Sequence, residues 1–150
     1  MRTALALILL LTAPAQAEGI LGTWAGEYTC GQGLTGMTLT ISEQPDGNAR
    51  ALAYFYPVTA NPDVPWGCFT LRGTYDPATG EAVLRQEKWL VKPERYGMAD
   101  LEGTVSPNGA TFTGKVTRLM RCTTFAFDRE TEPKPTPAAC SPSLLLSMRR

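Results

Sequence analysis

Pairs of carboxylates are the first chemistry to consider in this sequence, because a glycosidase can work with Asp and Glu side chains alone. Four acidic residues fall in segments that we expect to be strands: Glu27, Glu87, Asp100 and Glu102. Each lies at a polar or ambiguous position of its strand, and their spacing indicates no pairing. We therefore interpret them as solvent-exposed surface residues and expect no catalytic pair.

Nucleophilic catalysis that depends on histidine is excluded by a missing residue type. The sequence contains no histidine, so it cannot supply a Cys–His or a Ser–His–Asp arrangement. It also has no Gly-x-Ser-x-Gly elbow, no P-loop and no dinucleotide glycine pattern. The segment GQGLTG at 31–36 is similar to a phosphate loop, but it leads into a strand instead of a helix, so we predict a turn. We expect neither an enzyme nor a cofactor.

Aromatic side chains are the better candidates for binding. We select Tyr56, Trp66, Trp89 and Tyr96 as possible ligand-binding or partner-binding residues, with Tyr54 near them in the sequence. Gathered at one end of the domain, they would form a surface with apolar faces and polar tips. Scattered, they would be ordinary core and rim residues. Trp66, in the Pro-flanked segment PDVPWGCF, is the best local candidate.

Short strands separated by turns must position these residues. The segments PDGN at 45–48, DPATG at 76–80 and SPNG at 106–109 combine an Asp or Pro start with a Gly that tolerates positive φ, as hairpin turns require. The segment at 56–69 carries three prolines, and we expect it to be a long ordered connection at one barrel end. We expect eight strands, beginning near Leu21, Gly36, Ala49, Cys68, Glu81, Gly97, Ala110 and Arg121.

The strands alternate between apolar and polar residues. Met37, Leu39 and Ile41, for example, alternate with threonines and a serine, which is typical of a sheet with one buried and one wet face. Eight such strands in one small domain can bury their apolar face only if the sheet closes or folds over on itself. The sequence therefore predicts an all-β fold, a closed antiparallel up-and-down barrel, with a two-sheet β-sandwich as the alternative.

The chain is expected to have three parts. Residues 1–17 contain Arg2, an apolar run and the small-residue motif AQA, which together predict a cleaved signal peptide. After this cleavage we expect no membrane-spanning segment. Residues 18–130 form the barrel domain, and residues 131–150 form a Pro-rich tail. We therefore expect a periplasmic or secreted protein.

The charge balance and the cysteines indicate which partners and which cross-links to expect. The full chain has 14 basic and 14 acidic residues. Cleavage of the signal peptide removes Arg2 and leaves 13 basic against 14 acidic residues. This balance argues against a nucleic-acid partner, because phosphate binding needs a concentrated basic patch. Four cysteines in an exported chain predict two disulfides, with three possible pairings among Cys30, Cys68, Cys122 and Cys140. Their spacing does not suit zinc, and we expect no metal site. The oligomeric state stays open.

The first strand carries a Gly-x-Trp motif. Trp24 can plug the closed end of a barrel, and a cation from the last strand, Arg129, is placed to cover its ring. This "GTW" and the late arginine resemble the calycin group, which includes lipocalins, fatty-acid-binding proteins and avidins. Avidins have an Asn at the position of Gly26, so the resemblance does not extend to biotin binding.

A second resemblance covers most of residues 22–129. Segments such as YFYPVTANPDVPWGCF, LRGTYDPATG and RCTTF are similar to an uncharacterised domain of secreted bacterial proteins, which stands alone or beside caspase-like peptidase domains. No catalytic role is implied for that domain. Its typical cysteines match Cys30 and Cys122, which implies that these two pair and that Cys68 pairs with Cys140.

Two functions are compatible with these features. The first is an exported, non-enzymatic barrel that binds a protein or a cell-envelope component through its loop end. The alternative is a carrier of a small apolar ligand inside the barrel. Small residues would leave space for it at Gly26, Ala51, Ala53, Gly73 and Gly114, whereas Phe69, Phe112, Phe125 and Phe127 could fill that space.

Overall fold

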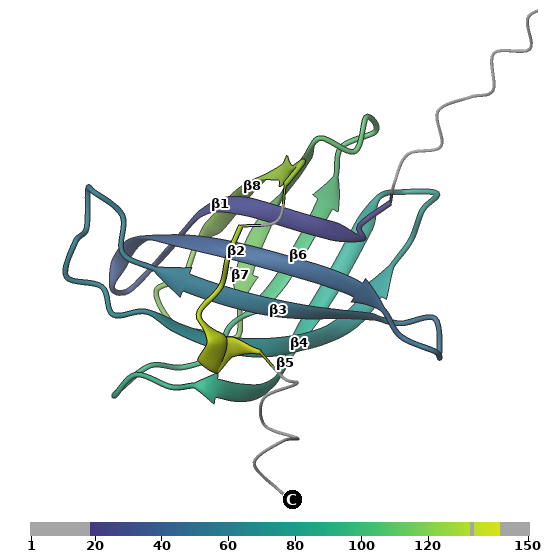
Figure 1. Cartoon of the computed structure of the whole chain (residues 1–150). Helices are drawn as coiled ribbons and strands as arrows, with labels where there is room; N and C mark the ends of the chain where they lie inside the picture. Colours follow the sequence, from purple (N-terminus) through teal and green to yellow (C-terminus); the bar gives the residue numbers. More distant parts are fainter. Residues whose placement is uncertain (1–18, 133, 142–150) are drawn as a thin grey trace, which may run out of the picture.

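The computed structural model describes residues 19–132 and 134–141 (Figure 1). The expected signal peptide and the end of the tail lie outside the described residues. Eight antiparallel strands form one closed barrel, in which each strand pairs with its neighbours in the chain and the last pairs with the first. The strands are β1 (Gly22–Cys30), β2 (Gly33–Glu43), β3 (Ala49–Tyr56), β4 (Gly67–Tyr75), β5 (Glu81–Val91), β6 (Asp100–Val105), β7 (Thr111–Thr117) and β8 (Thr124–Glu130).

The predicted up-and-down barrel is confirmed, and the two-sheet alternative is wrong. The largest differences from the expected strand starts are three residues, at β2, β6 and β8, and two of them have local causes. β2 begins at Gly33 because this glycine takes φ 92° and pairs directly with Cys30, so only Gly31 and Gln32 remain in the turn. β8 begins at Thr124 because the loop before it contains two left-handed residues, Arg118 and Arg121.

One end of the barrel is closed by side chains and short turns. Trp24 is completely buried, and its Nε1 donates a 2.9 Å hydrogen bond to the carbonyl of Ile20. The ring of Phe112 lies 5.8 Å away in an edge-on arrangement. The guanidinium of Arg129 lies over the indole ring, as the sequence predicts. This half of the barrel interior is further filled by Phe125 and Phe127, whose stacked rings lie 4.9 Å apart.

Three of the small residues leave no space for a ligand, contrary to the expectation. A Cβ at Gly26 would overlap the carbonyl oxygen of Ala126, and one at Gly73 would overlap that of Val83. Gly114 is blocked in the same way by Glu102 of the neighbouring strand. These glycines therefore permit close approach of adjacent strand backbones.

Two disulfides tie the barrel together. Cys30, at the end of β1, bonds to Cys122 in the loop before β8. Cys68, on β4, bonds to Cys140 in the 3-10 turn η1 (Ala138–Cys140). Both pairs agree with the pairing that the resemblance implies, and disulfides are typical of proteins in an oxidising compartment.

The second disulfide anchors residues 134–140, which we call the strap. Figure 1 shows the strap running over the outside of the barrel toward β4. Thr38, which the alternation with Met37 and Leu39 predicted to be exposed, is buried on this outer face, and so is Thr70. Thr38 lies in a groove that also includes Lys134 and Pro135 of the strap, so covering by the tail explains its burial.

Candidate functional site

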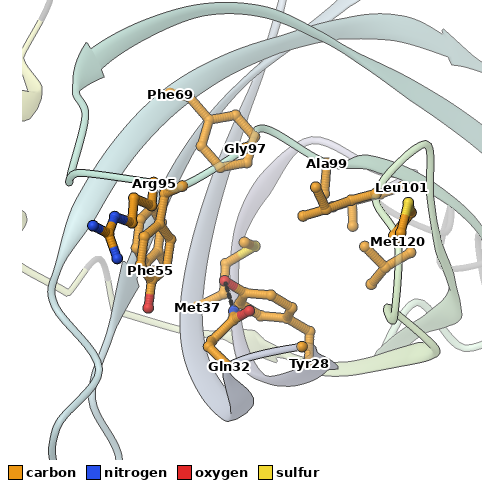
Figure 2. Close-up of a pocket in the computed structure, with 14 residues that line it drawn as sticks. Tyr28, Gln32, Met37, Phe55, Phe69, Arg95, Gly97, Ala99, Leu101 and Met120 are labelled. Atoms are coloured by element: carbon orange, nitrogen blue, oxygen red, sulfur yellow. Dashed lines mark hydrogen bonds between the residues drawn. The ribbon is translucent and has the colours of Figure 1, made fainter.

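The end of the barrel opposite Trp24 is open. Here the short β1–β2 turn meets three longer connections, residues 57–66, 92–99 and 118–123. The 57–66 connection is held to the rim by Asn61, whose Nδ2 donates to the carbonyl oxygens of Gln32 (2.7 Å) and Leu34 (3.1 Å). We call this end the mouth. It contains a cavity of about 250 Å³ (Figure 2).

Most of the cavity wall is apolar. Aromatic rings come from β1, β3, β4 and the 92–99 connection, and aliphatic side chains come from β2, β6, β7 and the 118–123 loop. The aromatic members are Tyr28, Phe55, Phe69 and Tyr96, and the larger aliphatic members are Met37, Leu101, Val116, Leu119 and Met120.

Phe55 organises the aromatic side of the mouth. Its ring stacks on Tyr96, with centroids 5.6 Å apart and planes 7° apart. Trp89 packs edge-on against Phe55 at 6.2 Å and against Phe69 at 5.2 Å. Two of the four aromatic residues selected from the sequence, Trp89 and Tyr96, are thus brought together here. Sequence reasoning missed Phe55, because its position on β3 indicates only that it faces inward.

A small polar cluster interrupts the apolar wall. Gln32 Nε2 donates to Tyr28 Oη at 3.1 Å and to Thr35 Oγ1 at 3.3 Å. Thr35 Oγ1 in turn donates to the carbonyl of Gly33 at 3.2 Å. Burial raises the pKa of the Tyr28 phenol well above its ordinary value, although its hydrogen bonds with Thr35 and Gln32 oppose this effect. Tyr28 is therefore uncharged at neutral pH and presents a polar but neutral group beside the cavity.

The loop between β7 and β8 is fixed at both ends. At its start, Arg118 Nε lies 3.2 Å from the buried carboxylate of Asp100, and at its end Cys122 is bonded to Cys30. Leu119 and Met120 stand between these anchors and line the cavity. Met120 is 87% exposed, so an apolar side chain is held in water at the rim.

The expectation that Asp100 is a solvent-exposed surface residue is wrong. It is completely buried instead of exposed. Its carboxylate accepts from Arg85 Nη1 at 3.1 Å and from the backbone N–H of Gln86 at 2.8 Å. Arg85 also binds Glu102 at 2.6 Å. The hydrogen bonds to Glu102 and Asp100 raise the pKa of the Arg85 guanidinium. Asp100 and Glu102 thus belong to a cluster of ion pairs with Arg85 and Arg118. This cluster supports the 118–123 loop at the mouth.

The other two selected aromatic residues lie outside the barrel. Trp66 is 42% exposed and meets Tyr54 edge-on at 6.3 Å, and Tyr54 lies 5.3 Å from Tyr56. Together with Lys134 and Pro135 of the strap, they line a groove of about 630 Å³, which we call the outer groove. The structure therefore divides the selected residues between two places, the outer groove and the mouth.

The fold and the site together define a class of structure: a disulfide-bonded, closed eight-stranded antiparallel barrel that is plugged at one end and has an aromatic-walled cavity at the other. No protein-family model matches the sequence, and no curated protein is detectably similar to it. Within residues 19–132 and 134–141, no helix is long and apolar enough to cross a membrane. The same residues contain no cluster of three or more His, Cys, Asp or Glu side chains suited to a metal ion.

Proposed function

We propose that this chain is a periplasmic or secreted, non-enzymatic binding protein whose barrel holds one small apolar molecule at the mouth. The observation that supports this proposal is the cavity of about 250 Å³, which opens at the mouth while the other end is filled by Trp24 and phenylalanines. Pockets that bind small molecules are concave and mostly apolar, with a few polar groups that fix orientation. The mouth has this composition.

The size of the cavity suits a small ligand. An engineered apolar cavity of about 150 Å³ stays dry and binds benzene. The mouth cavity is larger than this, so it can hold a molecule of one or two rings. Binding would remove apolar surface of the ligand and of the cavity wall from water, and this burial would drive association.

Native mass spectrometry of the protein purified from its exported compartment tests the proposal directly. We expect a mass excess that disappears on denaturation, and displacement of an apolar dye from the protein by small apolar competitors. The variant Ala99→Leu should weaken dye binding, because Ala99 lines the cavity and the added carbons occupy it. Ala110→Leu, in the exposed turn at the closed end, is the matched control. No mass excess and no dye binding would contradict the proposal.

A second candidate function, binding of a protein or a cell-envelope component, is supported by the outer groove. An exposed Trp beside two Tyr rings is a composition enriched at binding hot spots. Trp66→Ala should abolish capture of a partner from the exported fraction. Leu21→Ala removes a comparable apolar group, 40% exposed, from the closed end and should leave capture unchanged. Equal capture by wild type and Trp66→Ala would contradict this second function.

A further inference from the structure

We propose that the ligand of the mouth cavity is an uncharged aromatic molecule with one N–H or O–H group, which donates a hydrogen bond to the side-chain oxygen of Gln32. This inference rests on the proposed function and specifies the class of ligand. Three features of the cavity carry it: the shape of its walls, the open acceptor on Gln32 and the distribution of charge.

The walls suit a flat ring. Phe55 and Tyr96 form a nearly parallel stack on one side, and Tyr28 and Phe69 contribute further rings to the lining. Aromatic pairs prefer offset-stacked or edge-on contacts, which a planar ligand can make with several of these rings at once. A flexible chain of the same volume would lose more conformational freedom on binding. A compact aromatic molecule therefore fits this wall best.

Gln32 supplies an acceptor that the protein does not use. Both hydrogens of its Nε2 are engaged, by Tyr28 Oη and by Thr35 Oγ1, which fixes the orientation of the amide. Among the described residues, no donor is placed on Gln32 Oε1, and this half-buried side chain lines the cavity. Figure 2 shows the amide next to the ring of Tyr28. A ligand donor that reaches this oxygen would complete the hydrogen bonding of the amide.

Charge around the cavity favours a neutral ligand. No described residue with a carboxylate lines it, so a buried cation would have no counter-charge there. The lining includes one cation, Arg95, but Figure 2 shows its guanidinium pointing away from the other lining residues. An anion inside the cavity would therefore also be unpaired. Burial of an unpaired charge is costly, and an uncharged molecule avoids this cost.

Calorimetric titration with indole and benzofuran tests the inference. The two probes have the same bicyclic shape, but only indole carries an N–H group. Wild-type protein should bind indole about threefold to tenfold more tightly than benzofuran, as expected for one hydrogen bond. Gln32→Met keeps the length of the side chain and removes the acceptor, so it should bind both probes equally. Gln32→Glu retains an acceptor oxygen and should restore the preference for indole.

Gln44→Met is the matched control, because Gln44 lies in the turn after β2 at the closed end and should leave the preference intact. The circular dichroism spectrum and thermal midpoint of each variant establish that it is folded. Equal binding of both probes by wild type, or an unchanged preference in Gln32→Met, would overturn the inference and leave the proposed function standing. Tighter binding of benzylammonium than of indole would overturn the uncharged class. Binding of neither bicyclic probe would overturn the inference, and it would contradict the proposed function as well only where binding of the apolar dye is also absent.

Discussion

Arg129, on the last strand, covers the indole of Trp24 on the first, with its guanidinium carbon 4.1 Å from the ring centroid. The same guanidinium donates hydrogen bonds to the carbonyl oxygens of Gly109, Leu21 and Gly19. One side chain therefore connects β1, β8 and the turn before β7 at the place where the two ends of the sheet meet. This contact therefore adds to the backbone pairing of β1 with β8 that closes the barrel, and it covers Trp24, which fills the closed end.

Replacement of Arg129 should destabilise the barrel. Arg129→Met keeps much of the apolar stem but loses the cation over the ring and leaves three carbonyl groups without this donor. We expect the free energy of unfolding in urea to fall by about 3 kcal/mol. Arg72→Met removes an exposed arginine paired with Asp46 and should cost less than about 1 kcal/mol. Equal effects of the two substitutions would show that Arg129 behaves as an ordinary surface residue.

The fold could be predicted from the sequence because its signals are local. Each strand alternates over a few residues, and each short turn at the closed end has its own Asp, Asn, Pro or Gly. The contact between Trp24 and Arg129 followed from closure, since closure places the first strand beside the last. The close approach of backbones at Gly26, Gly73 and Gly114 was not predictable, because a missing side chain indicates space and close contact equally well.

The site was only partly predictable. Alternation gives the face of a strand on which a residue lies, but it does not give the depth along the barrel axis. Phe55 and Phe127 both face inward, yet one lines the mouth and the other belongs to the closed half. Gln32 carried no signal, because a polar residue in a short turn is ordinary. The burial of Asp100 depends on two arginines that are distant in sequence, Arg85 and Arg118.

Gly114 offers a direct test of the close strand approach. Gly114→Ala would place a Cβ on the carbonyl oxygen of Glu102 and the Cα of Gly103, so β6 and β7 would have to separate. We expect a loss of about 3 kcal/mol in the free energy of unfolding, measured in urea. Thr113→Ala, at the exposed neighbouring position, should cost about 1 kcal/mol or less. A small effect at Gly114 would instead support the initial expectation of free space inside the barrel.

Stability should fall at alkaline pH, in part through Tyr28. Burial raises the pKa of this phenol in the folded protein above the ordinary value of 10.0. Between that value and the higher folded pKa, the unfolded chain loses the proton and the folded chain keeps it, so unfolding is increasingly favoured as pH rises. The contribution approaches about 1.4 kcal/mol per pH unit.

Tyr28→Phe isolates this contribution. The variant should be less stable than wild type near neutral pH by about 1 kcal/mol, because Gln32 loses an acceptor. Above pH 10 its stability should decline less steeply than that of wild type. Urea unfolding across this pH range measures both slopes, and equal alkaline slopes would refute the role of Tyr28.

The two disulfides should differ in their effect on the mouth although they are similar in their effect on stability. They close loops with sequence separations of 92 and 72 residues. Constraint of the unfolded chain then predicts that the free energy of unfolding falls by about 4 kcal/mol when either disulfide is removed by a double Cys→Ala substitution.

The Cys30–Cys122 disulfide also anchors the loop that carries Leu119 and Met120, whereas Cys68–Cys140 anchors the strap on the outside of the barrel. Cys30→Ala/Cys122→Ala should therefore weaken dye binding at the mouth under conditions where the protein remains folded, and Cys68→Ala/Cys140→Ala should leave it unchanged. Equal loss of dye binding in both double variants would mean that general loosening of the barrel, and not the anchoring of this loop, controls the cavity.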